Sequence, residues 1–427
     1  MLRLMVNSRS YITTDASQWL RKRLHFFAMA LAGIAIISSA FHFWPFNNSK
    51  AWQILCPQNF VVFIWFLVLA AYILSKNNRQ TITSSLPHLS VFAYLCFNIL
   101  SIAFTPDFER TVIYTAKLTL ILVGGYTLFS IALFNKHFLR IFYNLMTAAI
   151  VINILYCLIA RFGLGTEEFG FHSSAYKYGT YIGILAPLCM VYFLTSSKSW
   201  KIALGLIISA SAIASSGTLG ALVSITAGML VAMIILPRWS VKLCILCSII
   251  LGIGSLLIIS DLNHASYIFD DIKLSEKDDA NLKQRYIEWQ AEINLLEKRT
   301  VTGTAAGCIN DYRSNFYYRL PKLNTLKAFD QNGWLATGAE TGILGLVCFC
   351  WIVSFYGRLA LVQVVNSNLK QSRIEHNFAV ANFVGFIAAC VANLFSSIHY
   401  NGILIVFVLL LALISRTSFF ETEQHVN

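Results

Sequence analysis

A dense group of polar and aromatic residues stands out near position 315 of this 427-residue chain. It combines carboxylate, guanidinium and phenol groups in Asp311, Tyr312, Arg313, Phe316, Tyr317, Tyr318 and Arg319. Such a mixture suits a sugar ring, because aromatic faces stack on its C–H groups while polar groups bond its hydroxyls. The alternative interpretation is an ordinary loop that packs on a membrane surface.

An amphipathic helix is predicted just before this group. From Asn281 onward, apolar residues recur at helical spacing, in Leu282, Tyr286, Trp289, Ile293 and Leu296. Such a helix can lie along a membrane interface with Tyr286 and Trp289 at headgroup level. Gly303 and Gly307 follow and permit tight turns. The concentrated polar chemistry of the chain is therefore expected in one long loop, residues 261–341.

The elements that must position this loop are apolar. Hydrophobic residues make up 57% of the chain and charged residues only 12%, about half the charge of an average soluble protein. A spanning helix needs about 20 mostly apolar residues. Such stretches occur at 24–44, 59–75, 86–104, 111–134, 141–160, 178–195, 201–216, 218–236, 243–260, 342–358, 377–397 and 400–415.

The sequence thus predicts an all-α polytopic membrane protein. Residues 1–427 form a single membrane domain with about 12 transmembrane helices, and the long extracytoplasmic loop contains short helices. The division between the seventh and eighth stretches is the least distinct, because they abut at Ser215-Ser216-Gly217.

Lys and Arg placement predicts the orientation. Arg21, Lys22 and Arg23 precede the first stretch, and alternate loops beyond it are basic. Both termini and the basic loops are therefore expected in the cytoplasm, and the 261–341 loop on the outer side of the membrane. The net charge of +12 implies no nucleic-acid partner, because basic loops face anionic lipid headgroups.

The chain lacks the sequence motifs of several enzyme classes. The chain has no P-loop, HExxH or GxSxG pattern, and no paired Cys/His set with metal spacing outside the predicted spans. The acidic residues of 261–279 could hold a divalent cation loosely but lack an EF-hand pattern. Cys56 and Cys308 both fall on the outer side and could pair. We predict no metal and no cofactor.

Four short pieces of the sequence, the signature pieces, resemble a known family. They are 285–289 (RYIEW), 303–307 (GTAAG), 331–335 (QNGWL) and 340–346 (ETGILGL). In this order, within the long loop of a twelve-span chain, they resemble the O-antigen polymerase and ligase family of the Wzy/WaaL type. The resemblance covers about 283–346; elsewhere only helix number and loop placement match.

The resemblance implies a metal-independent glycosyltransferase. Such enzymes take a glycan from an undecaprenyl-diphosphate donor outside the cytoplasm and join it to an acceptor hydroxyl. In a polymerase of exopolysaccharide, capsule or O-antigen, the acceptor is another lipid-linked repeat unit. In a ligase it is lipid A-core or another acceptor. A chain-length regulator is a candidate partner of the polymerase.

The resemblance also implies site residues. A cation must meet the diphosphate, and Arg285 matches the family's loop arginine, whose guanidinium binds phosphate oxygens bidentately. The candidate catalytic residues are Arg285, Asp330, Gln331 and Asn332. The candidate substrate-binding residues are Tyr286, Trp289, Asp311, Arg313, Tyr317, Arg319, Arg161, Lys177 and His399. Glu340 is expected at a helix start, where a carboxylate favours the positive end of the dipole.

Two positions depart from the family pattern. Family ligases and many polymerases have a histidine where this chain has Gln331, and an arginine near Ser215-Ser216-Gly217-Thr218 that is absent here. Glutamine cannot accept a proton, so either Asp330 is the base or no strong base is used. His172 and His399 are further candidates in predicted outer loops. Both departures weaken the ligase interpretation more than the polymerase one. They also leave open the alternative that the protein is an inactive relative of the family.

A transporter or flippase of lipid-linked oligosaccharides is the alternative from another class. Transporters tend to place ionisable groups near the bilayer midplane. Here only Lys117 falls deep within a predicted span, and the other polar residues crowd into the long loop. That pattern favours chemistry at the membrane surface, and a polymerase above the alternatives.

Overall fold

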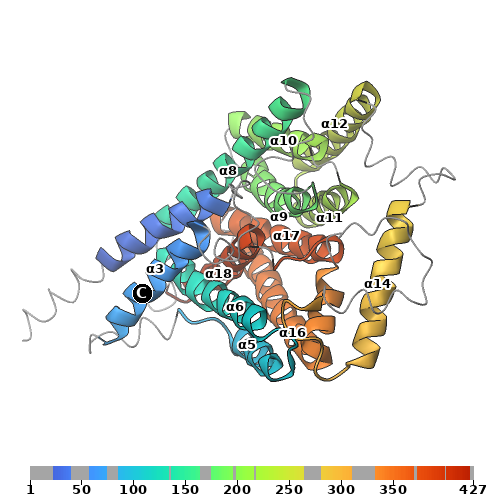
Figure 1. The fold of residues 1–427 in the computed structure, drawn as a ribbon. Helices are drawn as coiled ribbons and strands as arrows, with labels where there is room; N and C mark the ends of the chain where they lie inside the picture. Colours follow the sequence, from blue (N-terminus) through green and yellow to red (C-terminus); the bar gives the residue numbers. More distant parts are fainter. Residues whose placement is uncertain are drawn as a thin grey trace, which may run out of the picture.

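The computed structural model describes residues 23–39, 57–74, 85–133, 136–163, 175–195, 199–215, 218–263, 280–309, 332–369, 373–399 and 401–423. Helices dominate these residues, and no strand occurs among them. After a first helix, Arg23–Ser39, they are α3 (Pro57–Leu74), α5 (Leu89–Leu100), η2 (Ser101–Phe104), α6 (Phe108–Thr119), η3 (Leu120–Gly125), α7 (Tyr126–Ala132), α8 (Lys136–Gly163), α9 (Ala175–Leu194), α10 (Ser199–Ser215), α11 (Leu219–Ile235), α12 (Trp239–Asn263), α14 (Ala280–Lys298), α16 (Gly333–Leu369), α17 (Arg373–Phe395) and α18 (Asn401–Glu423) (Figure 1).

The helices fit a membrane protein. Five stretches are long and apolar enough to cross a bilayer: Phe108–Ala132, Phe138–Ala160, Lys177–Leu194, Gly333–Ser367 and Glu375–Phe395. Shorter apolar helices occur at Arg23–Ser39, Asn59–Ala70, Leu89–Phe104, Ser199–Ser215, Leu219–Ile235, Trp239–Gly254 and Ile403–Arg416. The structure is thus consistent with the predicted all-α membrane class. The count of twelve crossings stays a prediction.

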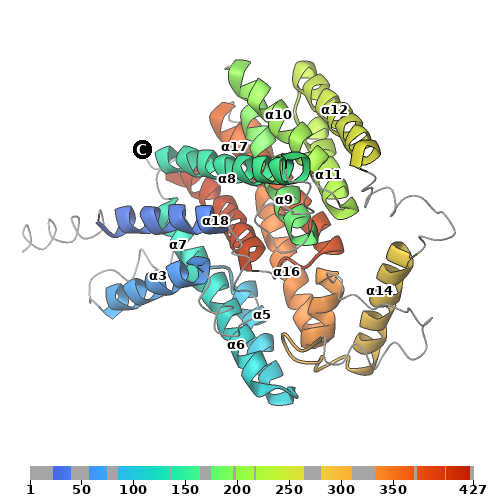
Figure 2. The same ribbon diagram turned by 45° about the horizontal axis from the view of Figure 1, so that its top comes forward.

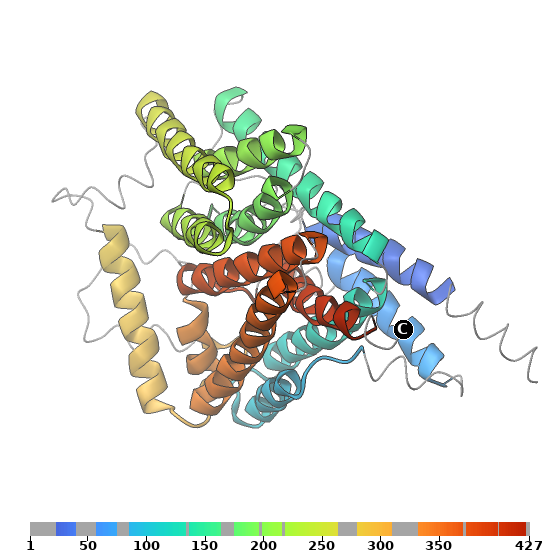
Figure 3. The same cartoon turned by 180° about the vertical axis from the view of Figure 1, so that it is seen from behind.

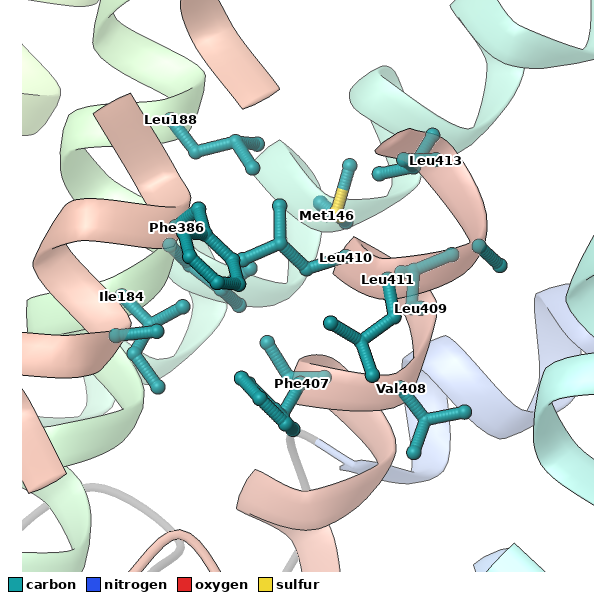
Figure 4. Close-up of a cluster of buried hydrophobic side chains, with 14 of the residues drawn as sticks. Met146, Ile184, Leu188, Phe386, Phe407, Val408, Leu409, Leu410, Leu411 and Leu413 are labelled. Carbon is teal, nitrogen blue, oxygen red and sulfur yellow. The ribbon is translucent and has the colours of Figure 1, made fainter. Parts of the chain in front are cut away.

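The core of the bundle lies around α17 and α18. Helix α17 packs against α9, α11, α16 and α18, and the two red helices lie among the others in Figure 3. Every side chain from Ile403 to Ile414 of α18 is buried, as expected for a helix that is apolar all round. Figure 4 shows Phe407 and Leu410 of α18 near Phe386 of α17 and Ile184 of α9.

Small residues let the helices around α17 approach closely. A Cβ on Gly228 of α11 would lie 2.7 Å from the Pro187 Cβ of α9. A Cβ on Gly220 would lie 2.5 Å from the Phe395 Cβ of α17. Backbones that come this close pack well without a hydrophobic driving force in lipid. The seventh and eighth apolar stretches are separate helices, because Thr218 accepts a bond from the Ala221 N–H at the start of α11.

Helix ends that the topology assigns to the outer side meet at one end of the bundle. We call this the loop end; it contains the C-terminal ends of α5, α10 and α17 and the N-terminal ends of α6, α11 and α18. Gly220 contacts Phe395 there. At the opposite end, Asn377 Nδ2 of α17 donates to the Thr195 carbonyl after α9 (3.1 Å). The predicted alternation of sides is compatible with this packing.

Reporter fusions test the orientation itself. Because basic loops stay in the cytoplasm, fusions at Lys76, Arg238 and Lys370 are expected to report cytoplasm, and one within 262–280 the outer side. Alkaline phosphatase and a cytoplasmic fluorescent protein give complementary signals at each site. A cytoplasmic signal from 262–280 would reverse the orientation and place the loop end on the wrong side for the proposed chemistry.

Candidate active site

The second signature piece, 303–307, packs against a kink in α16. The N–H of Thr304 donates to the Ala339 carbonyl (2.9 Å), and that of Ala305 donates to the Glu340 carbonyl (3.0 Å). Beyond the kink, the Ile343 N–H donates to the carbonyl of Thr300 (2.7 Å). Two signature pieces that are far apart in the sequence therefore form one hydrogen-bonded unit.

Glycines are required on both sides of this unit. Gly303, Gly307 and Gly342 have φ of 64°, 79° and 73°, in the region that favours glycine. A Cβ on Gly303 would overlap the Glu340 carbonyl oxygen, and one on Gly342 would overlap that of Val301. Gly342 also interrupts α16, with ψ of −179°. The predicted tight turns at Gly303 and Gly307 are confirmed.

Further contacts fasten the loop to α5 and α6. The N–H of Ala306 donates to Ser101 Oγ at the end of α5 (3.3 Å). The thiol of Cys308 lies 3.3 Å from Thr111 Oγ1 in α6 and 3.6 Å from Thr105 Oγ1. Cys308 is a free, buried cysteine, and its conceivable partner Cys56 lies outside the described residues. The thiol therefore contributes to packing at the loop end.

The third signature piece begins α16. Asn332 Oδ1 accepts the N–H groups of Trp334 (3.0 Å) and Leu335 (3.3 Å), so it caps the helix. The indole N–H of Trp334 donates to the Cys390 carbonyl of α17 (3.3 Å). A Cβ on Gly333 would overlap the side-chain amide of Asn393. Asn332, predicted to be catalytic, is thus seen in a role that fixes the start of α16.

Removing this cap has a predictable cost. Asn332→Ala leaves two backbone N–H groups without their acceptor, and N-cap loss typically costs about 1 kcal/mol. Asn332→Asp keeps an acceptor oxygen and is the matched control. We expect the alanine variant, but not the aspartate variant, to unfold at lower temperature in detergent. Equal midpoints for the two variants would show that the cap contributes nothing.

Helix α14 is confirmed, and it packs on the protein through a face other than the predicted apolar one. The side chains that pack on the protein are Ala291 and Leu295, which form a small core with Ile309, Ala336 and Ala339. Small alanines on α16 allow α14 to lie close, at the edge of the bundle beside α16 (Figure 2). Trp289 and Ile293, which belong to the predicted apolar face, are half-buried, and the placement of that face at the membrane interface stays a prediction.

Two carboxylates lie on the packed face of α14. Glu288 and Glu292 are buried, although neither belongs to the apolar face that the spacing predicted. Arg285 and Tyr286 lie on the same helix, three and two residues before Glu288. The packing of α14 on α16 therefore brings the first signature piece to the same assembly as the other three.

Four ionisable side chains gather beneath the kink. Tyr94 Oη of α5 is 3.4 Å from His399 Nε2, and their rings stack with centroids 6.2 Å apart. The Glu340 carboxylate accepts the N–H of Gly307. Lys117 of α6 acts electrostatically on both Glu340 and His399. Four elements thus contribute one group each to this cluster, in which Lys117 is half-buried and the other three are buried.

His399 is held neutral by its surroundings. It lies in the turn between α17 and α18, and burial followed by the positive charge of Lys117 lowers its pKa to about 4. At neutral pH the imidazole can therefore donate one hydrogen bond and accept another.

Acid should destabilise the protein through this residue. Because the pKa of His399 is lower when folded than its ordinary 6.5, the unfolded chain takes up the proton first as pH falls. The contribution of neutral His399 to the free energy of unfolding is complete above about pH 6.5. It is lost as the pH falls towards 4, by on the order of 3 kcal/mol. We expect the unfolding midpoint of the wild type to fall further over this range than that of His399→Gln. Parallel curves for the two proteins would contradict the expectation.

Other sequence candidates are only partly placed. Lys177 lies at the start of α9, beside Tyr178, whose hydroxyl donates to Ser215 Oγ (2.9 Å). Arg161 lies in the last turn of α8. The remaining candidates fall outside the described residues: His172, Asp311, Arg313, Tyr317, Arg319, Asp330 and Gln331.

Sequence reasoning missed part of the cluster. Glu340 was expected just before a helix start, and it lies two residues before Gly342, where a kink divides α16 into two helical segments. Sequence reasoning missed its contacts: the carboxylate accepts the Gly307 N–H and interacts electrostatically with Lys117. The sequence signal that could have indicated this cluster is Lys117, a charged residue deep within a predicted span.

The assembly agrees with a comparison against known families. Residues 204–350 match the family described as O-antigen ligase. The family resemblance is confirmed. The matched residues run from α10 into α16 and include all four signature pieces. The match therefore supports the interpretation of this chain as a member of the O-antigen polymerase and ligase family. A search of curated proteins found no match to the chain.

The family match indicates a class of activity. It points to a glycosyl-transferring enzyme of the O-antigen ligase or polymerase type, with lipid-linked glycan substrates. The apolar helices agree with a multi-pass membrane protein.

Proposed function

We propose that the protein polymerises undecaprenyl-diphosphate-linked oligosaccharide units on the outer face of a bacterial inner membrane. The observation that carries the proposal is the assembly of all four signature pieces at the loop end. The third and fourth pieces lie at the start and at the kink of α16, the second is hydrogen-bonded to that kink, and the first lies on α14, which packs beside α16. The product is an exopolysaccharide, capsule or O-antigen, and a chain-length regulator is a partner to be sought.

The reaction draws its energy from the donor. No nucleotide sugar or ATP is available outside the cytoplasm, so the glycosyl-diphosphate bond must supply it. Charge develops on the diphosphate as this bond breaks, and fixed cations stabilise that charge most when water is excluded. Arg285 is proposed for this role, because α14 packs beside the start of α16. Lys177 and Arg161 are proposed as further contacts of the diphosphate.

The acceptor must lose a proton as it attacks. Asp330 directly precedes Gln331 and Asn332, and the Asn332 side chain caps the start of α16. Asp330 is therefore the candidate base next to the third signature piece. The other option is that Gln331 and Asn332 only orient the hydroxyl and no strong base is used. Tyr286, Trp289 and the polar-aromatic group 311–319 are proposed to bind the sugars.

Ligation to lipid A-core is the second candidate. The missing histidine at Gln331 and the missing arginine near Ser215 make it the weaker one. A deletion strain separates the possibilities. Polymerisation predicts that single lipid-linked units accumulate outside and that the intact gene restores a ladder of lengths. Ligation predicts polymer that remains lipid-linked. Flipping predicts units trapped on the cytoplasmic leaflet. Either of the last two results would overturn the polymerase proposal.

A further inference from the structure

Tyr94 and His399 have no assigned part in the reaction proposed above, yet they lie beside the start of α16. The ring of His399 is 5.8 Å from that of Phe349, centroid to centroid, and Phe349 is 5.1 Å from the Trp334 ring. Trp334 follows Asn332 by two residues and is bonded to it. Two ring contacts therefore connect His399 to the third signature piece.

Buried polar atoms without partners lie on the two segments that carry this pair. Among the described residues, Asn98 Oδ1, Asn393 Nδ2 and Ser396 Oγ have no hydrogen-bond partner, and each residue is 1% exposed. Asn98 lies one turn from Tyr94, and the other two precede His399 in the same segment. An unsatisfied buried polar group costs about 1–3 kcal/mol. A bound polar molecule would satisfy such groups.

The chemistry of these atoms fits a sugar hydroxyl. A hydroxyl both donates and accepts, and the three groups offer an amide oxygen, an amide N–H and a hydroxyl. Asn393 also fixes the turn, since its Oδ1 accepts the Ile398 N–H (3.0 Å) while its side chain fills the space beside Gly333. The turn that carries His399 is thus held against the start of α16.

We infer that His399 accepts the proton of the attacking hydroxyl, in a subsite completed by Tyr94, Asn98, Asn393 and Ser396. The inference rests on the proposed function and gives the proton to His399 in place of Asp330. The hydroxyl oxygen bonds to C1 of the donor sugar while the C1–O bond to the diphosphate breaks. The electron pair of that bond leaves with the diphosphate, and the hydroxyl proton moves to the imidazole.

The electrostatic setting suits a weak base. Burial and the charge of Lys117 keep the imidazole neutral before the reaction. A loose, oxocarbenium-like transition state asks little of the nucleophile, whose proton becomes acidic only as the new bond forms. The same positive charge then disfavours the imidazolium, which passes its proton to water or to the leaving diphosphate. Glu340 and Tyr94 are the other ionisable groups that face this cluster.

Kinetics on the purified, full-length protein in liposomes test the inference. The substrate is the lipid-linked repeat unit extracted from cells that lack the protein. We expect His399→Gln to lose about 10²–10⁴-fold in kcat with little change in KM, as for removal of a general base. The control is His376→Gln, another partly buried histidine, which bonds Ser367 near the far end of α17. Asp330→Asn is compared directly.

The outcomes separate the inference from the function. If the wild type polymerises and His399→Gln keeps kcat within threefold, the inference is overturned and the function stands. If Asp330→Asn shows the large loss instead, the proton belongs to Asp330. Should His399→Gln fail to fold, His399→Ala is assayed with added imidazole. Recovery of at least tenfold in kcat supports the inference, and no recovery overturns it. A wild type without polymerase activity refutes the function itself.

Discussion

Arg285→Ala is expected to abolish polymer synthesis while the protein still inserts in the membrane. The substitution removes the cationic fork, and Ala291 and Leu295, further along α14, belong to the small core that packs this helix on α16. Loss of a group that stabilises developing charge costs about 10²–10³-fold in rate. Arg285→Lys should recover little, because a point ammonium does not reproduce bidentate phosphate binding.

The matched control for this variant is Lys283→Ala, which removes one positive charge from the same helix, two residues before Arg285. Polymer ladders are compared at equal protein levels, measured by immunoblot of washed membranes. A full ladder from Arg285→Ala would remove the arginine from the mechanism. Equal losses in the two variants would show that local charge matters, and not the guanidinium.

Gly342→Ala should have the largest effect on the structure of the site. The residue has φ of 73° and ψ of −179°, a conformation essentially restricted to glycine that costs an L-residue about 1–3 kcal/mol. Its new Cβ would also overlap the Val301 carbonyl oxygen, which is backbone and cannot rotate away. We expect a total cost above about 2 kcal/mol, with separation of 303–307 from the kink and loss of polymerisation.

Gly254→Ala is the control, because a Cβ there meets nothing within 4 Å. In the helix α12 it should be neutral or stabilising by about 0.5–1 kcal/mol. Unfolding midpoints in detergent and polymer ladders are measured for both variants. A Gly342→Ala protein as stable and active as Gly254→Ala would contradict the interlocked unit.

Much of the helical arrangement was predictable from local patterns. Apolar length alone placed helices near most of the observed ones, and the break near Ser215-Ser216-Gly217 separates α10 from α11. Length could not predict that α16 begins at Gly333, nine residues before the expected span, because 333–341 is held by contacts with the 303–307 loop. The kink at Gly342 depends on those contacts too.

The site was predictable only where its residues are consecutive. The signature pieces 303–307 and 340–346 could be read along the chain, and they meet as one unit. The cluster of Tyr94, Lys117 and His399 could not be predicted, because its members come from three elements and only packing brings them together. Likewise, the buried face of α14 follows from the alanines of α16, which periodicity within α14 does not report.

The central claim is that this one protein joins lipid-linked units without another energy source. The most direct measurement is a reaction of the purified protein in liposomes with extracted undecaprenyl-diphosphate-linked repeat units, in EDTA and without ATP or nucleotide sugars. We expect a ladder of products that differ by one repeat unit, with release of undecaprenyl diphosphate. Folded wild-type protein that leaves only the single units, with no lipid diphosphate released, would contradict it.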